Sequence, residues 1–159
     1  LNDLEKAKAL VNKKAGTLLY ASNFSIGVNV FFALNCYLAK IMDKQTGYEV
    51  RLREIHHTQK LDAPSGTAIS LAEDILREIN GKDTWVNEGA KADNELEIIS
   101  ERVAGVPGTH IVDYEHAIDH IQISHTAHSR EGFVRGAILA AEWIKDKQGF
   151  FEMSDVLNL

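Results

Sequence analysis

The stretch "EIHHTQKLDAPSGTA", residues 54–68, joins a predicted strand to a predicted helix. Before it, Val50 and Leu52 alternate with charged residues, which is the pattern of a half-buried strand. After it, Ser65 is a suitable N-cap for a helix whose apolar residues recur at helical spacing as far as Ile79. The sequence therefore predicts that a strand delivers two histidines and a lysine to the start of a helix.

The start of that helix has the features of an anion site. Ser65, Gly66 and Thr67 place unpaired backbone N–H groups at a helix N-terminus, where the helix dipole also favours negative charge. Lys60 adds a movable positive charge just upstream, and Pro64 restricts the backbone between them. This combination favours a carboxylate or a small phosphate. Taken alone, however, the "PSGTA" segment is also an ordinary helix cap.

The adjacent histidines, His56 and His57, are the candidate residues for proton transfer. Neighbouring side chains at the end of a strand point to opposite sides, so at least one of the two is expected to share a cleft with Lys60. Histidine titrates near neutral pH and is the usual proton donor or acceptor in enzymes. A surface pair without catalytic function is the alternative for these two residues.

The remaining histidines do not predict a metal site. His116 and His120 are four residues apart, but they flank a predicted turn and no cysteine accompanies them. His56 and His57 are neighbours and cannot easily bind one ion. We expect no bound metal, and we expect the other three histidines to be hydrogen-bonded strand residues; these are His110, His125 and His128.

The composition excludes several classes of function. A chain of 159 residues with 45% hydrophobic residues is long enough for one globular unit with its own core. A net charge of -6 and a pI near 5.6 argue against nucleic acid or an anionic membrane as the main partner. The single cysteine, Cys36, suits a reducing cytoplasm. The apolar run at residues 26–42 is interrupted by polar residues, so no transmembrane or signal segment is expected.

The rest of the chain predicts an α+β fold, with a mixed β-sheet packed against helices. In the final helix, the apolar side chains expected to face inward include Phe133, Val134 and Ile138. Apart from the strand and helix around residues 54–68, the pattern predicts helices over residues 1–14, 26–43 and 131–147, strands over 17–21, 96–103, 110–114 and 120–128, and a loop over 82–94.

The sequence resembles the dihydrodipicolinate reductases, which are NADH- or NADPH-dependent enzymes of lysine and diaminopimelate biosynthesis. The resemblance rests first on the stretch at residues 54–68. It extends to "ASNFSIGVN" from Ala21, "GTH" from Gly108, "HTAHSREGFVRGAILAAEWI" from His125, and the final "GFFEMSDVLNL".

This resemblance implies a role for each matching residue. His56 and Lys60 correspond to the catalytic residues, with His56 as the proton donor or acceptor. A planar dicarboxylate substrate is held by residues at the helix start; these are His57, Ser65, Gly66 and Thr67. Contacts to the nicotinamide cofactor are implied for six residues; these are Ala21, Ser22, Asn23, Phe24, Arg130 and Phe133. A homotetramer in the cytoplasm is also implied.

The resemblance has one large gap. The family begins with a Rossmann domain, and no glycine-rich turn of that kind follows a strand in this chain. Residues 1–21 are therefore expected to be the tail of that domain, 22–146 the substrate-binding and oligomerisation domain, and 147–159 a segment that docks back. A non-catalytic module that binds a small carboxylate or phosphate is the alternative function.

Overall fold

The computed structural model describes residues 3–159, which form two compact units. One unit consists of Leu1–Asn29 together with Glu131–Leu159, and the other is Val30–Arg130. The boundary falls within helix α2 (Ile26–Met42). Because the candidate site residues 54–68 all belong to the second unit, the sheet of that unit determines how the site is built.

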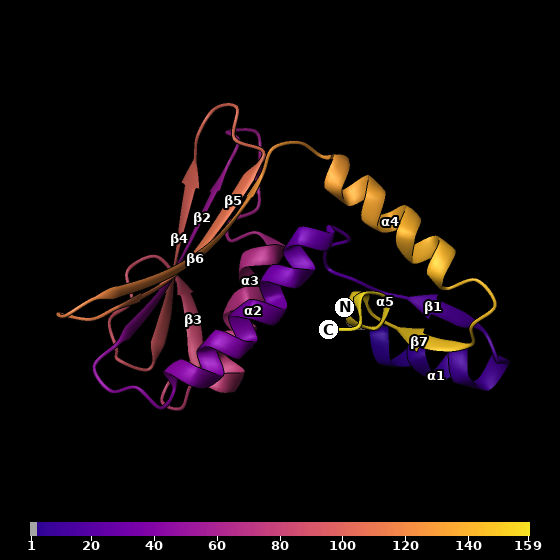
Figure 1. Ribbon diagram of the computed structural model, residues 1–159, viewed down its shortest axis with the longest axis horizontal. Helices are drawn as coiled ribbons and strands as arrows, with labels where there is room; N and C mark the ends of the chain where they lie inside the picture. Colours follow the sequence, from indigo (N-terminus) through magenta and orange to yellow (C-terminus); the bar gives the residue numbers. More distant parts are fainter. Residues whose placement is uncertain (1–2) are drawn as a thin grey trace. The chain divides into compact units, whose positions relative to one another are not determined.

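The unit Val30–Arg130 contains a mixed five-stranded sheet (Figure 1). Strand β2 is central, parallel to β4 on one side and antiparallel to β5 on the other. The outer pairs are β3 with β4, which are parallel, and β5 with β6, which are antiparallel. In sheet order the strands are β3 (Thr84–Asn87), β4 (Glu95–Arg102), β2 (Glu49–His56), β5 (Gly108–Glu115) and β6 (His120–Ala127).

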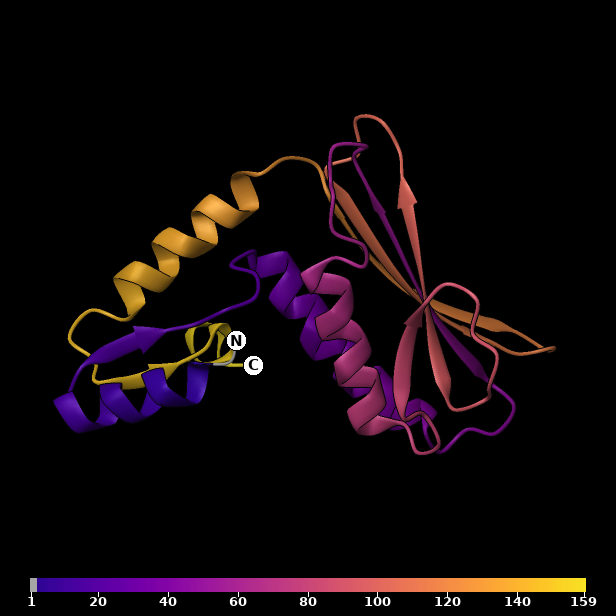
Figure 2. The ribbon, with the colours of Figure 1, turned by 180° about the vertical axis from the view of Figure 1, so that it is seen from behind.

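Helix α3 (Gly66–Glu78) and helix α2 lie on the same face of this sheet (Figures 1 and 2). The core lies between the helices and the sheet, and its side chains are fully buried from both layers: Leu52, Leu71, Ile75, Leu96, Ile98 and Val112. Burying apolar area at about 25 cal/mol per Å² is the main force that holds such layers together. The predicted α+β class with a mixed sheet is confirmed.

The alternation of β2 determines where the polar end of the strand lies. Val50 and Leu52 are buried toward the helices, as the sequence pattern predicts. The same period of two continues through Glu54 and His56, so these two polar side chains are also buried on the core side. The strand thus carries a carboxylate and an imidazole into the protein interior.

The other unit joins the two ends of the chain. Strand β1 (Thr17–Leu19) pairs in parallel with β7 (Gly149–Phe151), so the final segment docks onto an early strand. Helix α1 precedes β1, α4 precedes β7, and α5 follows it. Their bounds are Leu4–Lys14 for α1, Glu131–Trp143 for α4 and Met153–Leu157 for α5.

Four details differ from the sequence-based expectation. The predicted loop at 82–94 contains β3, an edge strand too short to show a clear period. Helix α1 ends at Lys14, and its C-cap, Ala15, adopts the left-handed conformation, although glycine is the usual residue for it and Gly16 follows. Helix α4 ends at Trp143 and buries Gly136 and Ala140. Its predicted inward side chains are instead at least 39% exposed; these are Phe133, Val134 and Ile138. Residues 1–2 of the first predicted helix lie outside the described residues.

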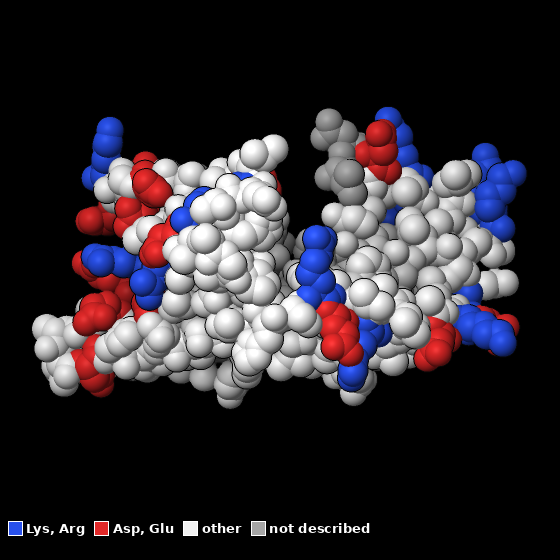
Figure 3. All heavy atoms as spheres, turned by 90° about the horizontal axis from the view of Figure 1, so that it is seen from above, with Lys and Arg blue, Asp and Glu red and all other residues white. Residues whose placement is uncertain are grey.

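No helix within residues 3–159 is both long enough and apolar enough to cross a membrane. In the view of Figure 3, basic side chains are interleaved with acidic ones rather than gathered into one basic area. The net charge of the full sequence is -6.

We predict that Gly136→Ala destabilises the unit that contains α4. An added Cβ would lie 1.7 Å from the carbonyl oxygen of Phe24, so the backbone of one segment would have to move. Such overpacking costs about 1–3 kcal/mol. The measurement is urea unfolding followed by the fluorescence of Trp143 in a Trp85→Phe background, since Trp85 lies in the other unit.

Gly132→Ala is the matched control in the same helix. There, the nearest atom to an added Cβ is a side-chain oxygen, that of Ser25 at 3.3 Å. This variant should change the free energy of unfolding much less than Gly136→Ala. Equal effects of the two substitutions would contradict the close packing of Gly136 on the Phe24 carbonyl.

Candidate functional site

The carboxylate of Glu54 is the centre of the candidate site. Glu54 is fully buried, at 0% exposure. Both carboxylate oxygens accept from the backbone N–H of Ser65 at 3.1 Å, and Oε1 also accepts from the Ser100 hydroxyl at 3.0 Å. The guanidinium of Arg102 lies 3.2 Å from Oε1. One buried charge therefore holds together the end of β2, the start of α3 and the end of β4.

His56 contacts this carboxylate on the core side of β2. Its Nε2 lies 3.4 Å from Oε2 of Glu54, and its Nδ1 lies 3.3 Å from the carbonyl oxygen of Pro107. Because a carbonyl can only accept, the Nδ1 atom carries a proton in this arrangement. Gly108 makes room for the ring, since a Cβ at that position would lie 2.8 Å from Cε1 of His56.

His110 joins the cluster from the neighbouring strand. Glu54 and His110 are directly opposite each other in the antiparallel pairing of β2 with β5. The Nε2 atom of His110 lies 3.4 Å from Nε2 of His56 and 3.2 Å from the hydroxyl oxygen of Ser65. The two imidazole rings meet edge to face, with centroids 5.1 Å apart.

Ser65 caps α3 and is committed to contacts inside the protein. It is 3% exposed, and its hydroxyl oxygen accepts from the backbone N–H of Ala68 at 3.2 Å, which confirms the predicted N-cap. Its own N–H donates to Glu54. The first helical residue, Gly66, is exposed, and nothing lies within 4 Å of the position of an added Cβ. A ligand could therefore approach the helix start at Gly66 and at the half-buried Thr67.

Lys60 lies in an ordered segment beside the cluster. Its Nζ atom is 2.8 Å from both carboxylate oxygens of Asp62. Arg102 donates to the backbone carbonyls of Lys60 at 3.3 Å and Asp62 at 2.6 Å, so the segment is tied to the same guanidinium that contacts Glu54. The Nδ1 atom of His57 is buried and has no hydrogen-bond partner within residues 3–159.

The surroundings fix the charges of this cluster. Burial alone would raise the pKa of Glu54, but hydrogen bonds from His56, Ser65 and Ser100 hold it well below the usual range. Burial, with His56 close by, lowers the pKa of His110 to about 3. The site therefore contains an ionised carboxylate and a neutral His110 near neutral pH. The ion pair with Lys60 lowers the pKa of Asp62 as well.

The sequence predicted only part of this cluster. His56 and Ser65 both contact Glu54, but Glu54, Ser100 and Arg102 were not singled out, and His110 was expected to be a hydrogen-bonded strand residue. The signal for Glu54 was present, because the alternation of β2 places it on the core side with Val50 and Leu52. No sequence pattern indicated Ser100, Arg102 or His110, because these residues approach Glu54 only through strand pairing between distant segments.

A separate pocket collects four of the residues implied for the cofactor. It has a volume of about 370 Å³ and lies within the unit that contains α4. Its lining is Ser22, Asn23, Phe24, Phe133, Val134 and Ala137. Of the two other implied residues, Ala21 is half-buried outside the lining and Arg130 belongs to the other unit. The two phenylalanine side chains give this pocket an apolar surface.

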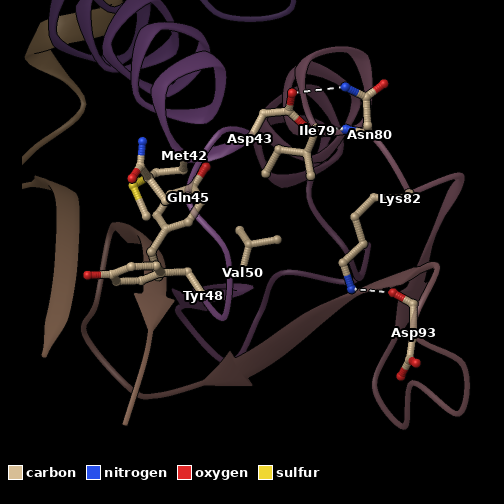
Figure 4. Close-up of a pocket in the computed structure, with 11 residues that line it drawn as sticks. Met42, Asp43, Gln45, Tyr48, Val50, Ile79, Asn80, Lys82 and Asp93 are labelled. Carbon is tan, nitrogen blue, oxygen red and sulfur yellow. Dashed lines mark hydrogen bonds between the residues drawn. The ribbon is translucent and has the colours of Figure 1, made fainter. Parts of the chain in front are cut away.

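A smaller pocket of about 200 Å³ lies between α2, the end of α3 and the sheet (Figure 4). Several polar groups around it bind one another: the Asn80 side chain donates to Asp43 at 2.9 Å, and Lys82 donates to the carbonyl of Asp93 at 2.7 Å. None of the site residues predicted from the sequence lines this pocket.

The fold is an α+β domain whose mixed sheet holds a buried cluster of one carboxylate and two imidazoles. Residues 27–157 match the family described as "Dihydrodipicolinate reductase, C-terminus". The chain belongs to this family, as the sequence resemblance predicted.

Similar proteins carry consistent names. The chain is 51% identical to a 4-hydroxy-tetrahydrodipicolinate reductase of Christiangramia forsetii over 158 residues, which are 99% of this chain and 66% of that protein. It is 41% identical to a reductase of the same name from Methanosarcina barkeri over 140 residues, which are 86% of this chain and 52% of that protein. The chain thus spans between about half and two thirds of the length of these relatives.

A solved structure supports the fold. The chain superimposes on a dipicolinate-bound dihydrodipicolinate reductase from Paenisporosarcina sp. TG-14 with a TM-score of 0.69. The alignment covers 95% of this chain and 58% of that one, at 24% sequence identity. At this identity the comparison establishes the shared architecture of the two chains.

We predict that His110 makes the stability of the chain depend on pH. The unfolded chain takes up a proton at this residue near the ordinary pKa of 6.5, whereas the folded chain does so only near 3. Above pH 6.5 the full contribution of His110 to the free energy of unfolding is present. This contribution is lost as the pH falls from 6.5 toward 3. The free energy of unfolding should fall by at most about 1.4 kcal/mol per pH unit from this group.

Urea unfolding between pH 7 and pH 5 measures this slope. His110→Gln should make the dependence shallower, because it removes the buried group that resists protonation. His120→Gln is the control, since His120 is exposed and pairs with Asp113 on the surface. An unchanged slope in His110→Gln would show that His110 is not the group responsible.

Proposed function

We propose that this chain supplies the substrate-binding and acid–base part of a 4-hydroxy-tetrahydrodipicolinate reductase of lysine and diaminopimelate biosynthesis. The observation that carries the proposal is the buried contact of Glu54 with both His56 and the start of α3. This contact supports the proposal, because a histidine can carry a proton, a helix start favours an anion, and the reduction of a dicarboxylate would use both. The names of the relatives point to the same reaction.

The substrate in this proposal is a small dicarboxylate held at the start of α3. Gly66 and Thr67 offer backbone N–H groups, and His57 has a buried Nδ1 atom without a partner in the described chain. Lys60 would exchange the carboxylate of Asp62 for that of the substrate. Ser65 would support the helix start from inside rather than contact the ligand. The solved relative named as dipicolinate-bound supports a ligand of this shape.

His56 is the proton donor in this proposal. In the overall reaction, hydride addition forms a C–H bond and the ring hydroxyl leaves as water, so one proton is consumed. His56 can supply that proton from its Nε2 atom while Pro107 holds the other ring nitrogen in place. Glu54 stabilises the ring when it carries the extra proton, because its ionised oxygen lies 3.4 Å away. Lys60 is the second catalytic group and stabilises negative charge on the substrate.

NADH or NADPH would supply the hydride. The pocket lined by Ser22, Asn23, Phe24 and Phe133 fits one flat nicotinamide ring, since both aromatic side chains offer an apolar surface to it. Ala21 and Arg130, for which the resemblance also implies cofactor contacts, are not part of that lining. The remaining part of the dinucleotide, with its charged pyrophosphate, needs a glycine-rich turn that this sequence does not contain.

The proposed domain boundaries separate the residues assigned to nucleotide binding from those assigned to substrate binding. Residues 1–21 and the docked segment 147–159 lie next to the nucleotide-binding part of a longer reductase, and residues 22–146 hold the substrate. We propose that the longer enzyme is a cytoplasmic homotetramer joined through the substrate domains, with β6 and the exposed face of the sheet at the interface. Light scattering of the longer enzyme would test this assembly.

A binding module without catalysis is the second candidate, because a carboxylate site needs only Lys60 and the start of α3. The two candidates differ in His56. In the longer reductase, His56→Ala should lower turnover by about 100-fold or more, the usual contribution of a general acid. The affinity for pyridine-2,6-dicarboxylate should remain within a few fold. Unchanged turnover would favour the binding module and exclude His56 as the proton donor.

We predict that the 159-residue chain itself binds pyridine-2,6-dicarboxylate weakly, at about millimolar affinity, because its proposed contacts are all present here. Lys60→Ala should abolish this binding, whereas Lys40→Ala, which removes a lysine from the exposed face of α2, should not. NADH should not bind measurably. NMR titration checks all three expectations, and tight NADH binding or unaltered binding by Lys60→Ala would contradict them.

A further inference from the structure

Three potential ligand atoms converge at the end of β2. Nε2 of His56 lies 3.4 Å from Nε2 of His110 and 3.4 Å from Oε2 of Glu54, and the third side of this triangle, from His110 to Glu54, is 3.8 Å. All three residues are at most 9% exposed. The three side chains come from adjacent strands, with Glu54 opposite His110 in the register.

These separations are longer than good hydrogen bonds, which join nitrogen and oxygen at about 2.7–3.2 Å. Two of the three are close to the spacing of two ligands across a tetrahedral zinc ion, which is about 3.3–3.4 Å for bonds of about 2.0–2.1 Å. The third, from His110 to Glu54, is longer at 3.8 Å. The equidistant point in the plane of the three atoms lies about 2.0–2.1 Å from each of them, so an ion with these bond lengths lies close to that plane.

Outer contacts hold two of the three ligand groups, those of His56 and Glu54, while Nε2 of His110 also lies 3.2 Å from the hydroxyl oxygen of Ser65. The Pro107 carbonyl accepts from Nδ1 of His56, so the Nε2 lone pair is directed into the cluster. Ser100 and Arg102 both contact Oε1 of Glu54 and leave Oε2 for the cluster, where Ser65 N–H is its other neighbour. Such outer contacts are what hold histidine and carboxylate ligands in place around a metal.

We propose that Glu54, His56 and His110 form a binding site for a divalent transition metal ion, with zinc as the preferred ion. Two imidazoles and one carboxylate are a common ligand set for zinc, with water in the fourth position. The His56 side chain is 11% exposed and offers an entry path. Arg102 shares the carboxylate and weakens the attraction, so binding should be reversible by a chelator.

The sequence predicted no metal because it considered histidines that are close along the chain. The site proposed here is assembled by strand pairing instead, and it does not depend on the proposed reductase function. It does have a consequence for that function. A metal ion on Nε2 of His56 would occupy the atom assigned to proton transfer, so zinc should inhibit the longer enzyme.

The test uses the metal-free 159-residue chain and Co²⁺, followed by displacement with Zn²⁺. Visible absorption should show four-coordinate Co²⁺ at one ion per chain, and Zn²⁺ should bleach it. X-ray absorption of the zinc-loaded wild-type chain should show two imidazole ligands. This measurement needs no variant, so it decides the proposal even where a substitution prevents folding. Absence of Co²⁺ bands, or a zinc ion with no imidazole ligand, would overturn it.

Variants then assign the ligands. His110→Gln and Glu54→Gln should each weaken Co²⁺ binding by about tenfold or more, since each removes one of three protein ligands. His120→Gln should bind as the wild type does, although His120 also lies near two carboxylates, Asp113 at 2.8 Å and Glu115 at 3.9 Å. Circular dichroism confirms that each variant is folded. Equal loss in His120→Gln, or none in folded His110→Gln, would refute the assignment.

Discussion

The burial of one carboxylate, that of Glu54, is the constraint on which the site depends. A charge at 0% exposure is costly unless it is paired and hydrogen-bonded. Glu54 meets this requirement with backbone, hydroxyl and guanidinium partners from two other segments and with the imidazole of His56 in its own strand. Since those partners lie at the start of α3, the end of β4 and the end of β2, satisfying the charge also fixes the relative positions of the groups proposed to bind substrate.

The fold brings these segments together through one mixed sheet. The parallel pairing of β2 with β4 aligns Glu54 with Ser100, and the antiparallel pairing with β5 aligns it with His110. The same burial, with His56 close by, keeps the pKa of His110 low and the ring neutral, because these effects outweigh the favourable charge of Glu54. In the proposed function the two histidines therefore play different parts: His56 carries a proton to the substrate, and His110 is its neutral neighbour.

The sequence was sufficient where the information is local. The period of two in β2, the cap at Ser65 and the helical spacing after it predicted a strand and a capped helix. It was insufficient where the information is in strand pairing. His110, Ser100 and Arg102 approach Glu54 only because β4 and β5 flank β2. The prediction of which face of α4 is buried was also wrong. Small residues such as Gly136 make the close contacts of this helix, whereas the large apolar residues are exposed.

The most direct test of this account is the turnover of the longer reductase with Glu54→Gln, compared with Glu97→Gln on the neighbouring strand. The substitution keeps the shape of the side chain and removes the charge that supports His56 and pairs with Arg102. The account predicts that turnover falls by about tenfold or more with Glu54→Gln, while Glu97→Gln stays close to the wild type. A folded Glu54→Gln enzyme with full turnover would contradict the central role of this buried carboxylate.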